Sequence, residues 1–194
     1  MVPEHHRDMQ EHHEIEQPSD WVYRFAPIIP SGGEVLDLAC GGGRHARYLA
    51  GLGLRVEAVD RDVGSLAALA KVAGVSTRYA DLEGAPWPYE GRRFDAVVVA
   101  NYLHRSLLPL LLRCLPEGGV LIYETFMRGN ERFGRPSNPA FLLEPGELLE
   151  AVRGELNVVA FEQGEVSTPR SAVIQRICAL RVRDVTSVKL PEYS

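Results

Sequence analysis

One segment of the sequence combines an acid in an apolar strand with a run of glycines. It reads Val35-Leu36-Asp37-Leu38-Ala39-Cys40-Gly41-Gly42-Gly43-Arg44. The glycines allow the chain to turn sharply into a helix and allow a ligand to approach the backbone. A carboxylate inside an apolar strand needs a partner that offsets its desolvation. Asp37 therefore predicts a positively charged ligand at the end of this strand.

The glycines alone fit more than one class of nucleotide-binding protein. Gly41-x-Gly43-x-x-Ala46 also matches the dinucleotide fingerprint, which would indicate an NAD-dependent oxidoreductase. Asp37, however, occupies a strand position that a dinucleotide fold keeps apolar. The chain has two lysines, and neither completes the Tyr-x-x-x-Lys motif of short-chain dehydrogenases. A nicotinamide oxidoreductase is therefore the disfavoured alternative.

Strands and helices alternate along the chain, which predicts a doubly wound α/β fold. We expect strands at 35–39, 55–59, 76–79, 94–99, 120–123, 156–161 and 172–182, and helices at 19–25, 44–52, 63–73, 107–115 and 145–152. Most of the strand candidates are continuous apolar runs, which are typical of strands covered on both faces. The last two strands have no helix between them and must be antiparallel neighbours. The prediction is a seven-stranded, mostly parallel sheet with one antiparallel strand near the C-terminus.

The length of 194 residues is enough for one domain. We expect a single domain over 19–185, preceded by a mobile arm over 1–18 and followed by a tail over 186–194. The connection at 124–143 shows no regular pattern, and a connection of that length in a compact domain is usually functional. We interpret it as a substrate lid.

The strand and glycine turn resemble the first motif of the class I S-adenosylmethionine-dependent methyltransferases, in which an acid and a hydrophobic residue precede Gly-x-Gly-x-Gly. Ala39 stands where that motif has its first glycine. Gly43-Arg44-His45 and Tyr123-Glu124-Thr125-Phe126 are most similar to the tellurite-resistance-type branch, and the resemblance spans 19–180. It implies a Rossmann-like methyltransferase fold, S-adenosylmethionine as cofactor and S-adenosylhomocysteine as product.

The resemblance also assigns the cofactor contacts. Asp37 would face the methionine end, Asp60 the two ribose hydroxyls and Asp81 the adenine amino group. The implied cofactor-binding residues are Asp37, Ala39, Cys40, Gly41, Gly43, Arg44, Asp60, Arg61, Asp81, Leu82 and Asn101. The combination of Asp37 with Asp81 favours methyl transfer over hydride transfer.

Candidates for proton transfer follow the fourth strand, at the edge where open α/β sheets bind ligands. His104 is the first candidate for a general base, because an unperturbed histidine titrates near neutral pH. Tyr102 and Glu124 are alternatives, and His104 could instead pack against the next helix. The segment 99–105 lacks the Asn/Asp-Pro-Pro-Tyr signature of enzymes that methylate exocyclic base amines, which disfavours that subclass.

The expected lid carries residues suited to an anionic or planar substrate. Arg128, Arg132, Arg135 and Phe133 are the candidate substrate-binding residues. The alternative is a solvated loop in which these arginines pair with Glu124 and Glu131.

Composition narrows the possible partners. The net charge is -5, so nucleic acid is an unlikely partner, and no apolar run reaches the ~20 residues of a membrane-spanning helix. The N-terminus has no apolar signal core, so we expect a cytoplasmic protein. Three cysteines without CxxC spacing predict reduced thiols and no metal site. The paired histidines near the N-terminus could bind a transition metal, although surface disorder explains them better.

These observations predict S-adenosylmethionine-dependent methyl transfer to a small-molecule acceptor. A non-catalytic module that binds S-adenosylmethionine or S-adenosylhomocysteine remains the alternative. The sequence assigns neither an acceptor nor an oligomeric state.

Overall fold

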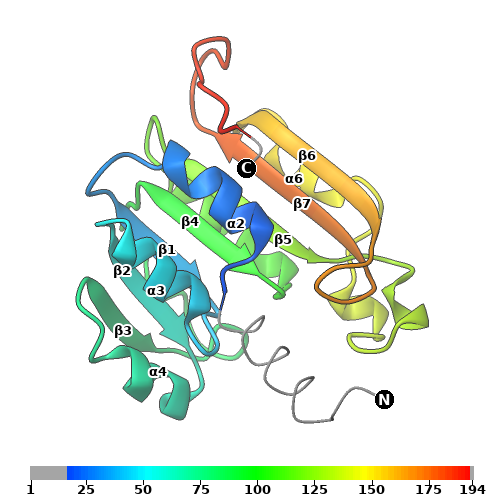
Figure 1. Cartoon of the computed structure of the whole chain (residues 1–194), viewed down its shortest axis with the longest axis horizontal. Helices are drawn as coiled ribbons and strands as arrows, with labels where there is room; N and C mark the ends of the chain where they lie inside the picture. Colours follow the sequence, from blue (N-terminus) through cyan, green and yellow to red (C-terminus); the bar gives the residue numbers. More distant parts are fainter. Residues whose placement is uncertain (1–16, 193–194) are drawn as a thin grey trace, which may run out of the picture.

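The computed structural model describes residues 17–192, which build a mixed sheet of seven strands (Figure 1). The strands are β1 (Glu34–Leu38), β2 (Arg55–Asp60), β3 (Val75–Tyr79), β4 (Ala96–Ala100), β5 (Val120–Phe126), β6 (Asn157–Val166) and β7 (Ala172–Leu180). Their order across the sheet is β3-β2-β1-β4-β5-β7-β6. The first five are parallel, whereas β7 is antiparallel to both of its neighbours. The predicted fold class is confirmed.

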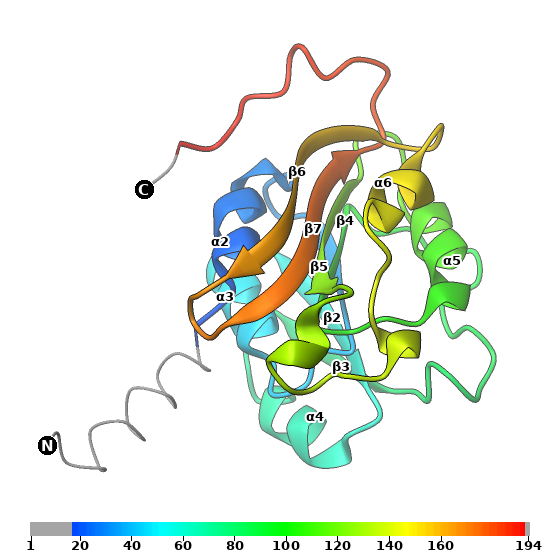
Figure 2. The ribbon, with the colours of Figure 1, turned by 90° about the vertical axis from the view of Figure 1, so that its right-hand side faces the viewer.

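Helices cover both faces of the sheet, as continuous apolar strands require. They are α2 (Asp20–Phe25), α3 (Arg44–Gly51), α4 (Val63–Leu69), α5 (Leu108–Arg113) and α6 (Glu147–Val152), with 3-10 turns η1 (Ala26–Ile28), η2 (Arg105–Leu107), η3 (Asn130–Arg132) and η4 (Pro139–Phe141). The first three helices lie on one face, and α5 and α6 lie on the other (Figure 2). Residues Ala96–Val99 of β4 are consequently fully buried.

Several elements are shorter than the sequence predicts. Helix α4 ends at Leu69 rather than at 73, because turn hydrogen bonds from Val72 to Leu69 and from Val75 to Val72 replace the helical ladder. The predicted helix at 107–115 is a 3-10 turn followed by α5, which ends at Arg113. At the N-terminus, Ser19 caps α2 by accepting a hydrogen bond from the backbone of Val22, as its residue type predicts.

Strand β5 is longer than predicted, and the prediction of an irregular segment from 124 onward was wrong for its first three residues. Glu124, Thr125 and Phe126 pair with β7, opposite Arg176, Gln175 and Ile174. The antiparallel partner continues the ladder beyond the point where β4 ends. The irregular connection therefore begins at Met127, which forms a bridge to Leu143.

Outside these elements, residues 181–192 contain no further helix or strand. Most of the predicted N-terminal arm, with both histidine pairs, lies outside the described residues. Within 17–192, no helix combines the length and apolar character needed to cross a bilayer.

Candidate functional site

The turn between β1 and α3 holds three residues in left-handed conformations. Ala39 has φ +52°, Gly41 +51° and Gly43 +77°. A Cβ atom on Gly43 would lie 2.3 Å from Leu69 Cδ2, so glycine is required for α4 to pack against the turn. Ala39 keeps the conformation that glycine adopts freely, at a cost of about 1–2 kcal/mol. The geometry of the glycine motif is therefore retained despite the alanine.

The middle of this turn exposes backbone to open space. A Cβ atom on Gly41 or Gly42 would meet no other atom within 4 Å. Backbone N–H groups at a turn that opens a helix are suited to polar and anionic groups of a ligand. The turn therefore offers a ligand an accessible stretch of main chain.

Asp37 is a buried acid with an unsatisfied oxygen. The side chain accepts a hydrogen bond from the backbone of Ala46 in α3, while Oδ2 has no hydrogen-bond partner among the described residues. Burial raises the pKa of Asp37 to about 7, and Asp60 adds to the increase while Arg44 opposes it. An uncompensated carboxylate oxygen next to an open glycine turn is suited to a cationic group.

Asp60 joins the end of β2 to the glycine turn. Its Oδ2 accepts the N–H of Gly41 at 2.8 Å, and its Oδ1 accepts the N–H of Asp62 at 2.9 Å. Each carboxylate oxygen has a second lone pair, so both remain able to accept hydrogen bonds from a ligand. Arg61 follows on the exposed surface.

Asp81 lies in the turn after β3. Its Oδ1 accepts the N–H groups of Glu83 and Gly84, both at 3.1 Å, and the neighbouring Leu82 is buried in the core. The charges of Asp81, Glu83 and Arg61 all act on Tyr102 after β4. The ends of β2, β3 and β4 therefore approach one another at the carboxyl edge of the sheet.

The chain leaves β4 through a second non-glycine residue with a positive φ angle. Asn101 has φ +56°, is exposed, and donates its N–H to the carbonyl of Glu124 at 3.0 Å. The next side chain, Tyr102, has a buried hydroxyl without a well-aligned hydrogen-bond partner among residues 17–192. Burial and the neighbouring Glu83 carboxylate raise the pKa of Tyr102. Tyr102 therefore keeps its proton at neutral pH and is suited to donating a hydrogen bond rather than to accepting a proton.

Glu124 and Asp37 share a cationic neighbour. Burial raises the pKa of Glu124, while the Ser19 hydroxyl and the charges of Arg176 and Arg44 lower it. Burial likewise lowers the pKa of Arg44, and Glu124 and Asp37 oppose that effect. We refer to Asp37, Arg44 and Glu124 as the acid–arginine cluster.

The two histidines near this edge have different surroundings. His104 is half-buried at the exit of β4, where its carbonyl accepts the N–H of Leu107 at 2.9 Å. His45 lies in the first turn of α3, as expected, and its buried Nε2 accepts the N–H of Ser19 at 3.2 Å. Burial lowers the pKa of His45 to about 3. The contact between α3 and the start of α2 was not visible in the sequence, because it joins residues far apart in the chain.

Two of the predicted substrate-binding arginines are engaged in ion pairs. Arg128 pairs with Glu144 at 2.8 Å, and Arg132 pairs with Glu165 at 3.2 Å. The alternative prediction, that these arginines pair with Glu124 and Glu131 in a solvated loop, was wrong about the partners. Both of the observed partners lie outside the segment and hold it against the domain.

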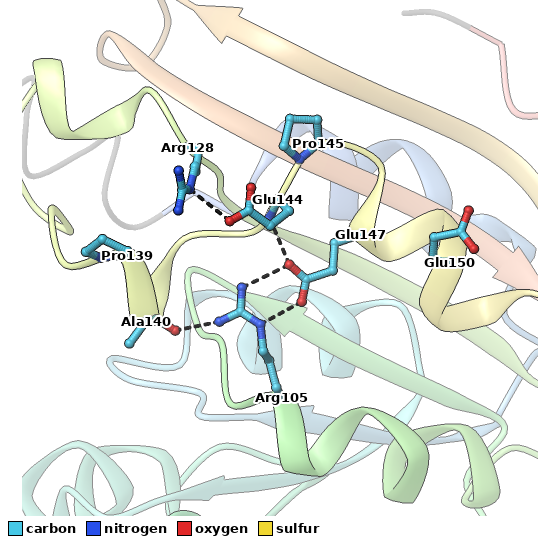
Figure 3. Close-up of a pocket in the computed structure, with 8 residues that line it drawn as sticks. All are labelled: Arg105, Arg128, Pro139, Ala140, Glu144, Pro145, Glu147 and Glu150. Atoms are coloured by element: carbon cyan, nitrogen blue, oxygen red, sulfur yellow. Dashed lines mark hydrogen bonds and ion pairs between the residues drawn. The ribbon is translucent and has the colours of Figure 1, made fainter.

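Arg105 anchors the same segment from the other side. It donates to both oxygens of Glu147, at 2.7 and 2.9 Å, and to the carbonyls of Ala140 and Leu142, both at 2.8 Å. Arg105, Ala140 and Glu147 line an open groove of about 610 Å³, together with Arg128 and Glu144 (Figure 3). The two arginines of this groove are already paired with glutamates. Their interactions therefore hold the segment after β5 against the domain.

A smaller cavity lies at the end of β5. It has a volume of about 140 Å³ and is lined by Phe126, Asn130, Phe133, Arg135, Arg170, Ser171 and Ala172. Of the four predicted substrate-binding residues, Phe133 and Arg135 lie here, whereas Arg128 and Arg132 do not. Sequence reasoning missed Arg170, since only the pairing of β6 with β7 brings it to this edge. Within 17–192, no group of three or more metal-ligating side chains is present.

The sheet order, the glycine turn after β1 and the acids at the following strand ends define the class I methyltransferase fold. Residues 35–119 match a protein family described as "Methyltransferase domain". This match, which spans β1 to the turn before β5, agrees with the resemblance stated above. No curated protein gives a significant match to the sequence.

Solved structures with the same fold include TehB and a TehB-like methyltransferase. TehB from Haemophilus influenzae has a TM-score of 0.69 and 23% identity, covering 84% of this chain and 62% of its own. A TehB-like S-adenosylmethionine-dependent methyltransferase from Corynebacterium glutamicum has a TM-score of 0.62 and 17% identity, covering 91% and 95%. Coclaurine N-methyltransferase, bound to N-methylheliamine and S-adenosylhomocysteine, has a TM-score of 0.57 and 18% identity, covering 71% and 47%. The chain thus spans less than two thirds of TehB and about half of coclaurine N-methyltransferase.

Proposed function

We propose that this protein binds S-adenosylmethionine at the glycine turn and transfers its methyl group to a small-molecule acceptor, with S-adenosylhomocysteine as product. The observation that carries the proposal is the buried, unpartnered Oδ2 of Asp37 beside a glycine turn whose backbone is open. A carboxylate in that position is costly unless a cation offsets it. A ligand with a sulfonium and an ammonium group supplies such a cation.

The residues present suit each part of this cofactor. Asp37 would hold the methionine end, Asp60 the ribose hydroxyls, and Asp81 with Leu82 the adenine. The backbone of Ala39, Cys40, Gly41 and Gly43, with Arg44, Arg61 and Asn101, would complete the contacts. A cation near Asp37 favours its ionised form, so the proton that Asp37 holds near neutral pH would leave on binding.

When bound, S-adenosylmethionine supplies a carbon activated by a positive sulfur. The protein's own residues are then required mainly to align the acceptor and to exclude water. If the acceptor carries a proton, His104 is the first candidate to remove it. Glu124 is the alternative, because it is a buried acid in the acid–arginine cluster. Tyr102 would instead donate a hydrogen bond.

A small acceptor agrees with the size of the cavity beside β5, which is about 140 Å³. It also agrees with coclaurine N-methyltransferase, a structural neighbour that holds the small molecule N-methylheliamine. Both observations support a small-molecule acceptor over a macromolecule.

The cofactor site is tested by calorimetric titration of S-adenosylhomocysteine into Asp60→Ala. Loss of the ribose hydrogen bonds should weaken affinity by about 1–3 kcal/mol, or roughly 5- to 150-fold. Glu117→Ala, which removes an exposed acid in the turn before β5, should bind as the unmodified protein does. Unchanged affinity in Asp60→Ala would contradict the assignment of Asp60.

Catalysis is tested by incubating the protein with methyl-labelled S-adenosylmethionine and a metabolite extract. Transfer of label to a small molecule supports the enzyme. Binding without transfer across a broad range of acceptors would favour a non-catalytic module, and binding of NADH instead would favour an oxidoreductase.

A further inference from the structure

The cavity at the end of β5 lies between two segments that are distant in the sequence. The 3-10 turn η3 and the residues after it form one wall, and the turn between β6 and β7 forms the other. Figures 1 and 2 both show these two segments side by side near the carboxyl end of β5. The cavity is therefore at the same edge of the sheet as the glycine turn.

Two arginines line this cavity without acidic partners. Among residues 17–192, neither Arg135 nor Arg170 forms an ion pair. The other arginines of the segment, Arg128 and Arg132, are paired with glutamates. Two guanidinium groups at one small cavity repel each other unless an anion lies between them.

The remaining walls are apolar or already hydrogen-bonded. Phe126 is buried, and the Arg170 guanidinium lies 5.7 Å from the centre of its ring. The side chain of Asn130 accepts the N–H of Val173 at 3.1 Å and donates to the carbonyl of Pro136 at 3.0 Å. Asn130 thus stabilises the wall of the cavity through its own hydrogen bonds. The groups available to bind a ligand are the two guanidinium groups and the Ser171 hydroxyl.

Charge interactions connect this cavity to the proposed cofactor site. The charge of Arg170 acts on Arg44, whose pKa burial also lowers. Arg44 in turn interacts electrostatically with Asp37 and Glu124. An anion bound between Arg135 and Arg170 would therefore act electrostatically on the acid–arginine cluster.

We infer that this cavity is the acceptor-binding subsite and that it takes the carboxylate of a small organic acid with an apolar or aromatic body. The inference rests on the proposed function. Guanidinium groups match a carboxylate in geometry as well as in charge. The phenyl rings of Phe126 and Phe133 would contact the body of the acid. An inorganic anion has no apolar part for these rings to contact.

The test uses benzoate as the probe, with sulfate and benzyl alcohol as comparisons. Calorimetric titration of the full chain, in the presence of saturating S-adenosylhomocysteine and in its absence, should show benzoate binding more tightly than either comparison. Arg170→Gln and Arg135→Gln should each weaken benzoate binding by about tenfold or more, because each removes a hydrogen bond to a charged group. Arg153→Gln, which changes an exposed arginine paired with Glu150 on α6, should have no effect.

Several results would overturn the inference. Equal affinity for sulfate and benzoate would indicate a site for inorganic anions, and equal affinity for benzyl alcohol would remove the role of the arginines. Undiminished benzoate binding in both arginine variants would place the acid elsewhere. Absence of benzoate binding in a protein that binds S-adenosylhomocysteine would refute the subsite alone. Benzoate binding without S-adenosylhomocysteine binding would instead refute the proposed function.

Discussion

Replacing Asp37 with asparagine should make the ligand-free protein less sensitive to alkaline pH. The folded protein holds the pKa of Asp37 at about 7, against 3.8 for an ordinary aspartate. The folded state therefore binds this proton more tightly than the unfolded chain does. The protonated group contributes its full stabilisation below pH 3.8. This stabilisation is lost progressively as the pH rises to about 7, and almost none of it remains at higher pH.

The size of the effect follows from these two pKa values. Each pKa unit corresponds to about 1.4 kcal/mol. Between pH 5.5 and pH 8.5, ionisation of Asp37 should reduce the free energy of unfolding by about 2 kcal/mol. Asparagine has no proton to lose, so this part of the pH dependence should disappear in Asp37→Asn.

The assay is urea unfolding of the ligand-free protein at both pH values. The change in unfolding free energy from pH 5.5 to 8.5 should be about 2 kcal/mol smaller in Asp37→Asn than in the unmodified protein. Glu117→Gln serves as the control, because Glu117 is exposed. The same substitution of Asp37 should weaken S-adenosylmethionine binding at pH 8.5. An identical pH dependence in Asp37→Asn and the unmodified protein would refute the assignment of a buried acid that awaits a cation.

Three further predictions concern the glycine turn and the histidines. Gly43→Ala should lower the free energy of unfolding by about 2–4 kcal/mol in urea, through its positive φ and the clash with Leu69, and a loss below about 1 kcal/mol would contradict that packing. The His45 imidazole resonance should not shift between pH 7.5 and 4.5 in an NMR titration, because the pKa of His45 in the folded protein is about 3, and a midpoint near 6.5 would contradict this. Because the unfolded chain takes up this proton near pH 6.5, the stability contributed by neutral His45 falls as the pH drops below 6.5. His104→Ala should reduce kcat by about 10²- to 10⁴-fold while S-adenosylhomocysteine affinity stays within about twofold, and an unchanged kcat would leave His104 with a packing role.

Local patterns were sufficient to predict most of the sheet. Continuous apolar runs such as Ala96–Val99 and Val120–Tyr123 reflect burial on both faces of the sheet, because each face is covered by packed elements. The glycine turn was equally visible, because positive φ angles and close packing restrict the residue type. The extension of β5 through Phe126 was not predictable in this way, since β7 supplies its hydrogen bonds from far along the chain.

The cavity beside β5 was only partly predictable for the same reason. Phe133 and Arg135 are recognisable as candidates in an irregular segment rich in arginine and phenylalanine. Arg170 is not, because it comes from the turn between β6 and β7, and its significance depends on the sheet order. The partners of Arg128 and Arg132 were missed likewise, because Glu144 and Glu165 lie outside the segment.

The central claim is that the glycine turn and the three acids at the following strand ends hold S-adenosylmethionine. Parallel calorimetric titrations of the unmodified protein with S-adenosylmethionine, S-adenosylhomocysteine and NADH test it most directly. We predict that the first two each bind at one site per chain and that NADH does not bind. Binding of NADH in their place, or of none of the three, would contradict the claim.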